Sequence, residues 1–138
     1  MAPGSIRHRR WYAVALAAAL VAAPMPAYAE GSWNSSLGNV RSGFLSRTWH
    51  DSNNDGTVTK TVLTGCSRSD DATFHLDVDL RRNRTAAPDV SYGRKSVAAC
   101  KGGTGTGTWG DQTSGDYFLQ FWHHDFGTVS ASSVRTTY

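Results

Sequence analysis

Polar side chains at alternate positions in residues 74–80 could bind a metal ion or form an acid–base pair. His75, Asp77 and Asp79 fall on one face of this segment, and apolar residues fall on the other. Next-but-one residues on a strand lie about 6 to 7 Å apart on the same face, so the imidazole and the carboxylates could act together. The same alternation is typical of a strand with one side on a core and the other in water, and we favour that interpretation.

A second group, His123, His124 and Asp125, ends the apolar segment at residues 116–123. Imidazoles and a carboxylate at a strand end can bind zinc. Adjacent strand residues point to opposite faces, however, which argues against one shared site. The sequence contains no Gly-x-Ser-x-Gly nucleophile motif. A small hydrolase using these histidines and aspartates is the enzyme alternative, and we predict no catalytic residues.

Residues 51–58 resemble the first half of a calcium loop. Asp51, Asn53 and Asp55 place oxygen ligands at alternate positions before Gly56, and calcium takes about six to eight oxygens. The position at which helix-loop-helix calcium loops place a bidentate glutamate is Val62, which cannot bind a metal. We therefore favour a polar hairpin turn that caps its own backbone, with calcium as the alternative.

A basic run at residues 80–88 includes Arg81, Arg82 and Arg84 and lies between the two cysteines. A constrained, exposed arginine loop could occupy a trypsin-like protease as an inhibitor does, because preorganisation lowers the entropy lost on binding. A basic surface turn is the simpler interpretation, and inhibition is kept as an alternative.

Exposed aromatic rings are the third kind of candidate site. Flat aromatic side chains stack on sugar rings and anchor interfaces. We select Trp109, Trp122 and Tyr92 as ligand-binding candidates, and we expect Trp109 to be the most exposed because it follows a Gly-Thr loop.

Residues 1–29 have the features of a secretory signal peptide. Three arginines precede an alanine-rich apolar run, and Ala-Tyr-Ala at residues 27–29 is a small-x-small cleavage site. The run is about half the length of a membrane-spanning helix. We expect a secreted, extracellular bacterial protein that begins at Glu30 and has no membrane insertion.

Removal of the signal peptide leaves no net charge. The full sequence has 14 lysines and arginines and 11 acidic residues, and the three signal arginines account for the difference. Nucleic-acid binders usually carry a basic excess, so we expect no nucleic-acid partner.

Cys66 and Cys100 are the only cysteines. An even pair in an exported domain usually forms a disulfide. Closing a loop of roughly 35 residues contributes about 3 to 4 kcal/mol in the chain-entropy account.

Alternation, with Gly-, Asn- and Asp-rich turns between the apolar segments, predicts an all-β fold. We expect an antiparallel β-sandwich of about seven short strands. The candidates are residues 57–65, 74–80, 90–92, 96–100, 106–109, 116–123 and 129–137, with 44–49 as a further one. Residues 101–105 predict a flexible loop. Residues 30–45 lack a firm pattern and are assigned to an N-terminal arm, and residues 46–138 to the sandwich domain.

The order of several short segments along the chain is similar to that of a known type of domain. Leu-Asp-Val-Asp-Leu at residues 76–80 precedes a turn with Pro88-Asp89, and Cys100, Gly-Asp-Tyr-Phe-Leu at residues 115–119 and a closing strand follow. From residue 57 onward the chain resembles the bacterial pre-peptidase C-terminal type β-sandwich domain of secreted proteases. The resemblance implies a jelly-roll-like sandwich with an accessory binding role, sometimes with calcium, and no catalysis.

Together these features predict a secreted, monomeric binding module. Its expected ligand is an extracellular glycan or protein. Protease inhibition by the arginine loop and a small hydrolase remain the two alternatives.

Overall fold

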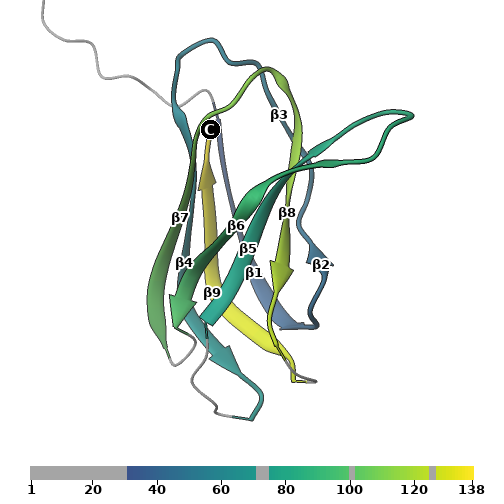
Figure 1. Ribbon diagram of the computed structural model, residues 1–138. Coiled ribbons are helices and arrows are strands. Elements are labelled where there is room, and N and C mark those ends of the chain that lie inside the picture. The colour runs from purple at the N-terminus through teal and green to yellow at the C-terminus, as the bar shows by residue number, and fades with distance from the viewer. Residues whose placement is uncertain (1–30, 71–74, 100–101, 125–126) are drawn as a thin grey trace, which may run out of the picture.

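The structure is a computed structural model that describes residues 31–70, 75–99, 102–124 and 127–138. The predicted signal peptide lies outside these residues, as do Phe74, Cys100 and Asp125. Over the described ranges the chain is all β, with nine strands and no helix (Figure 1). Nothing in those ranges could serve as a membrane-spanning helix.

The strands follow one another along the chain with short connections. They are β1 (Ser32–Val40), β2 (Phe44–Leu45), β3 (Trp49–Asp51), β4 (Val58–Arg68), β5 (His75–Asn83), β6 (Val90–Ala99), β7 (Gly103–Asp111), β8 (Gly115–Trp122) and β9 (Val129–Thr137).

All strand pairs are antiparallel, and they form two sheets. The four-stranded sheet has the order β1-β9-β4-β7, and the five-stranded sheet has the order β2-β8-β5-β6 with β3 also paired to β8. The prediction that residues 116–123 form a central strand is confirmed, because β8 pairs with β5 on one side and with β2 and β3 on the other.

The core consists of apolar side chains from both sheets, which face each other across it (Figure 1). From the five-stranded sheet, β5 and β8 contribute alternate residues, as a pleated strand with one buried side must. From the four-stranded sheet come residues of β1, β4 and β9. The fully buried members include Leu63, Leu76, Val78, Leu80, Leu119, Phe121 and Val129.

Residues 32–40 form an edge strand of the four-stranded sheet and contribute to the core. The sequence prediction assigned them to an arm, whereas the structure pairs β1 with β9 and buries Trp33, Leu37 and Val40 in the core. The register shifts twice along β1, after Ser35 and after Leu37. At the first shift the extra residue lies in β9, between Ala131 and Val134, and at the second it lies in β1, between Leu37 and Val40. The bulge in β1 places Leu37 and Val40 three residues apart, which interrupts the alternation of a regular strand.

Two further predictions differ from the structure in their boundaries. Residues 90–92 and 96–100 were predicted as separate strands, but β6 runs through both with a bulge near Gly93, whose φ is 96°. Only a glycine adopts such a conformation without strain. Residues 103–105, predicted as part of a flexible loop, belong to β7. Two early segments, β1 and β3, account for the larger number of strands.

Gly107 in β7 allows β6 to approach closely. A Cβ atom on Gly107 would lie 2.6 Å from Val97 Cγ1 and 2.8 Å from Trp109 Cη2. The absence of a side chain at this position therefore permits the packing of β7 against β6, and the threonines at residues 104, 106 and 108 are exposed.

Three threonines lie on the core side of the four-stranded sheet. Thr61 of β4 and Thr136 of β9 are fully buried, and their hydroxyl oxygens are 2.9 Å apart in a hydrogen bond. Thr59 is 1% exposed, and its hydroxyl has no hydrogen-bond partner among the described residues.

The two ends of the described chain are joined by backbone hydrogen bonds. The Gly31 N–H donates to the Tyr138 carbonyl at 2.9 Å, and the Tyr138 N–H donates to the Gly31 carbonyl at 3.0 Å. The Tyr138 ring packs on Trp49 at a centroid distance of 5.6 Å. The C-terminus consequently lies at the same end of the molecule as the β5–β6 hairpin, which projects beyond the other strands (Figure 1).

Candidate binding face on the five-stranded sheet

Nine side chains occupy neighbouring register positions on the side of the five-stranded sheet that faces away from the core. The register pairs Asp77 with Trp122 and Ser96, Asp79 with Gln120 and Arg94, and Arg81 with Phe118 and Ser91. Residues at the intervening positions of β5 and β8 are buried in the core, and alternate residues point to opposite sides. We call this set of nine residues the outer face.

Asp79 is at the centre of the outer face and is only 5% exposed. The Ser91 hydroxyl donates a hydrogen bond to Asp79 Oδ1 at 2.6 Å. The sequence analysis predicted a solvated face for this strand, but the carboxylate is covered by its neighbours. Burying a carboxylate is costly unless hydrogen bonds compensate, so this position has an organised polar surrounding.

Arg81 and Gln120 form a second polar contact across the same strands. Arg81 Nη1 donates to Gln120 Oε1 at 2.9 Å. The Nε atom of Arg81 is buried and has no hydrogen-bond partner among the described residues. The guanidinium is therefore held in place while one of its donors is unused.

Trp122 and Arg94 stack at the edge of this network. The Arg94 Cζ atom lies 4.1 Å from the centroid of the Trp122 ring, which is the geometry of a cation–π contact. The indole Nε1 of Trp122 is buried and unpartnered within the described part of the chain. Two aromatic rings, two guanidiniums, two carboxylates and an amide thus share one side of the sheet.

The other two predicted aromatic residues lie elsewhere. Trp109 packs partly buried against the core, and its indole N–H donates to the Gly93 carbonyl at 2.7 Å. It is thus not the free surface ring that we expected. Tyr92 is 37% exposed and contacts Tyr117 at a ring-centroid distance of 5.9 Å on the core side of β6. The structure brings only Trp122 to the outer face.

The predicted histidine and aspartate groups do not converge. His75 is exposed at the start of β5, on the same side as Asp77 and Asp79. His123 is 7% exposed and continues the core-facing register of β8, so it lies on the other side of the sheet. In the described ranges no three histidine, cysteine or acidic residues are grouped as metal ligands.

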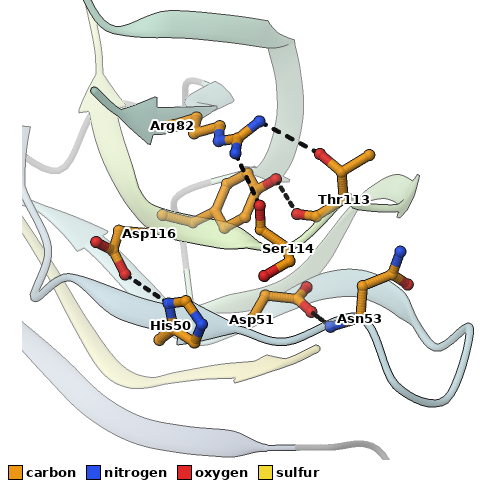
Figure 2. Close-up of polar contacts among 8 residues, drawn as sticks. His50, Asp51, Asn53, Arg82, Thr113, Ser114 and Asp116 are labelled. Carbon is orange, nitrogen blue, oxygen red and sulfur yellow. Dashed lines mark hydrogen bonds and ion pairs between the residues drawn. The ribbon is translucent and has the colours of Figure 1, made fainter. Parts of the chain in front are cut away.

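The loop at residues 51–57 is built from two turns capped by side chains. Asp51 Oδ1 accepts the Asn53 N–H at 2.8 Å (Figure 2), and Asp55 Oδ1 accepts the Thr57 N–H at 2.8 Å. Both contacts are Asx turns, in which a carboxylate satisfies the backbone two residues onward. At least one oxygen of Asp51 and of Asp55 is therefore used by the backbone of the loop.

The three arginines of the predicted inhibitor loop differ in their surroundings. Arg81 belongs to the outer face, as described above. Arg82 donates from Nη2 to the Ser114 carbonyl at 2.7 Å and from Nη1 to Thr113 Oγ1 at 3.3 Å (Figure 2). Arg84 is exposed on the projecting hairpin. Only Arg84 is placed as the freely inserting arginine of an inhibitor would be.

Tyr117 links this end of the molecule to the core. Its hydroxyl donates to the Thr113 carbonyl at 2.5 Å, and Arg82 Cζ lies 6.0 Å from its ring centroid. Burial raises the pKa of Tyr117 above its usual value of 10.0, and the neighbouring Tyr92 adds to the rise. Beside it, His50 Nδ1 lies 2.7 Å from Asp116 Oδ1 at the surface (Figure 2).

Sequence reasoning missed three members of the outer face: Ser91, Arg94 and Ser96, all on β6. The bulge near Gly93 and the gap predicted between two short strands concealed their register. A search of protein families, curated proteins and solved structures finds no match to this chain. The candidate site therefore rests on its own geometry.

Proposed function

We propose that this protein is a secreted, monomeric, non-catalytic binding module that recognises an extracellular glycan on the outer face. The proposal includes a jelly-roll-like sandwich, in keeping with the resemblance to the pre-peptidase C-terminal type domain. Two facing antiparallel sheets around one core support that architecture.

The proposal also includes a disulfide between Cys66 and Cys100. Cys66 is fully buried in β4. The Gly102 N–H donates to the Cys66 carbonyl at 2.6 Å, and Gly103 is the register partner of Cys66. Gly102, which is only two residues after Cys100 in the sequence, is therefore close to Cys66. A disulfide requires such proximity of the two cysteines.

The stacked pair of Arg94 and Trp122, beside the nearly buried Asp79, is the observation that carries the glycan proposal. A sugar presents hydroxyl groups that donate and accept hydrogen bonds, together with apolar ring faces. Carboxylate, amide and guanidinium groups at fixed positions match the hydroxyls, and the indole matches the apolar ring face. The equal numbers of acids and arginines on the outer face favour a neutral ligand over a strongly charged one.

Sedimentation with insoluble chitin, cellulose and peptidoglycan tests the proposal on the secreted protein. Trp122→Ala and Arg94→Ala should weaken binding, and Trp122→Ala by about 2 kcal/mol, or about 30-fold, as for an aromatic anchor residue. Arg135→Ala is the matched control, because Arg135 is exposed on β9 of the other sheet. Equal retention of all four proteins, or binding to none of the polymers, would refute a glycan site on the outer face.

Protease inhibition remains a second candidate because the β5–β6 hairpin projects from the body (Figure 1) and carries the exposed Arg84. An inhibitor of this kind would insert Arg84 into the specificity pocket of a trypsin-like protease. Trypsin assayed with micromolar protein should then be inhibited by the wild type and not by Arg84→Ala. Full trypsin activity with the wild-type protein would remove this candidate.

A further inference from the structure

The core-side surface of the β5–β6 hairpin carries a hollow separate from the outer face. It has a volume of about 480 Å³ and is lined by Arg82, Asn83, Arg84, Thr85, Val90 and Tyr92. The hairpin projects beyond the four-stranded sheet, so this side of it is not covered by the core (Figure 1). No acidic side chain is among the lining residues.

Arg82 is held in a fixed orientation at the base of the hollow. Its two terminal nitrogens each donate one hydrogen bond, to the Ser114 carbonyl and to Thr113 Oγ1 (Figure 2). Its guanidinium also lies over the Tyr117 ring. A guanidinium has five N–H donors, so donors remain for a ligand after these two contacts. Because the side chain is already ordered in the folded protein, ligand binding need not incur the entropy cost of ordering it.

Arg84 supplies a second guanidinium to the same hollow. It is exposed, and its hydrogen bonds among the described residues are made by its backbone, whose N–H donates to Asp89 Oδ1 at 3.3 Å. The side chain is therefore available to a ligand. The remaining lining residues Asn83, Thr85 and Tyr92 add an amide and two hydroxyl groups.

We propose that this hollow binds an oxyanion, namely the carboxylate, sulfate or phosphate group of a ligand, between Arg82 and Arg84. Two guanidiniums and no carboxylate favour a negative charge, and planar guanidiniums donate paired hydrogen bonds to such oxygens. The site is independent of the glycan proposal, because none of its lining residues belongs to the outer face. Either proposal can therefore fail without the other.

Titration of the secreted protein with sodium sulfate, sodium phosphate and galacturonate at constant ionic strength tests the site, with backbone amide NMR shifts of residues 82–92 as the readout. At least one anion should produce saturable shifts centred on these residues. The three arms distinguish the carboxylate, sulfate and phosphate sources. Methyl galactoside is the neutral control, and it should leave these amides unshifted.

Arg84→Gln and Arg41→Gln are a matched pair of charge-removing variants. Both arginines are exposed, and Arg41 lies in the β1–β2 connection near the opposite end of β8. Arg84→Gln should raise the Kd about tenfold, as expected for one charge-assisted contact, whereas Arg41→Gln should change it less than about twofold. Arg82→Lys, which keeps the charge but loses the planar fork, should also weaken binding. Absence of saturable shifts with all three anions, or equal weakening by Arg84→Gln and Arg41→Gln, would overturn the proposal.

Discussion

The buried threonines of β4 allow one chemical change to be compared at two positions two residues apart. Thr61 shares a hydrogen bond with Thr136, whereas the Thr59 hydroxyl has no partner in the described residues. Thr→Val keeps nearly the same shape of the side chain and replaces the hydroxyl with a methyl group, so the two positions differ from the wild type by the same chemical change. Because the burial of the two side chains is the same within 1%, the hydrogen bond is the main difference between them.

The two substitutions should have effects of opposite sign. Thr61→Val leaves the Thr136 hydroxyl buried without a partner and should lower the free energy of unfolding by about 1 to 3 kcal/mol. Thr59→Val removes a buried hydroxyl that is unsatisfied already and should raise it by about 1 kcal/mol. The double variant Thr61→Val, Thr136→Val should be close to the wild type, because both partners become apolar together.

Urea unfolding measures these three variants together with the single variant Thr136→Val, which completes the double-mutant cycle. At a constant slope, a change of 1 kcal/mol moves the midpoint by roughly 0.3 to 1 M. Because each single variant should cost at least about 1 kcal/mol and the double variant should be close to the wild type, the coupling between Thr61 and Thr136 should be at least about 2 kcal/mol. Midpoints that move in the same direction for Thr59→Val and Thr61→Val, or a double variant as unstable as the sum of its singles, would refute the reasoning.

Four other outcomes are expected. Gly107→Ala should cost about 1 to 3 kcal/mol in thermal melts because its Cβ overlaps Val97, whereas Gly38→Ala, which has no atom within 4 Å of its Cβ, should be nearly neutral. A reducing agent should lower the melting temperature, because the proposed disulfide between Cys66 and Cys100 would contribute about 3 to 4 kcal/mol; an unchanged temperature would exclude the bridge. Melting temperatures in calcium and in chelator should agree, because the Asx turns at residues 51–57 already use carboxylate oxygens, and a rise in calcium would contradict this. Ultraviolet titration should show one tyrosine, Tyr117, ionising above pH 10.0. Since the pKa of Tyr117 is raised in the folded state, its contribution to the free energy of unfolding is fully present below the pKa of the unfolded state. This contribution is lost as the pH rises through the pKa of the folded state.

The regular strands could be predicted from the sequence, including which side of each is buried. In β5, Leu76, Val78 and Leu80 alternate with polar residues, and all three are fully buried. Local alternation is sufficient there because the pairing with β8 is regular. The same pattern indicated that β8 is a central strand, because apolar residues occupy both of its sides.

Bulged strands could not be predicted in this way. In β1, a bulge places the buried Leu37 and Val40 three residues apart, and in β9 another bulge places the buried Ala131 and Val134 three residues apart. In β4, buried residues alternate as far as Leu63, and an extra residue near Gly65 then moves Cys66 onto the core side. Each bulge adds one residue and breaks the period of two on which strand prediction depends.

The outer face could be predicted from the sequence only in part, for a different reason. Asp79 and Trp122 were both singled out from the sequence, but neither their proximity nor the burial of Asp79 follows from local pattern. Both depend on which strands are neighbours and on the register across a bulge, since Arg94 reaches Trp122 over the intervening β5. Contacts between residues distant in the sequence depend on how the strands assemble into a sheet. The pattern of residues within one strand does not determine them.

The paired backbone of Gly31 and Tyr138 determines how this domain can be attached to other proteins or to a surface. Both residues continue strands of the four-stranded sheet, so cargo fused at either position leaves the molecule from the same place, on the sheet opposite Trp122. A few linking residues should suffice to close the chain into a ring, with new ends opened in the exposed connection at residues 41–43. Such a permuted chain would keep the outer face and the hairpin hollow intact and unobstructed.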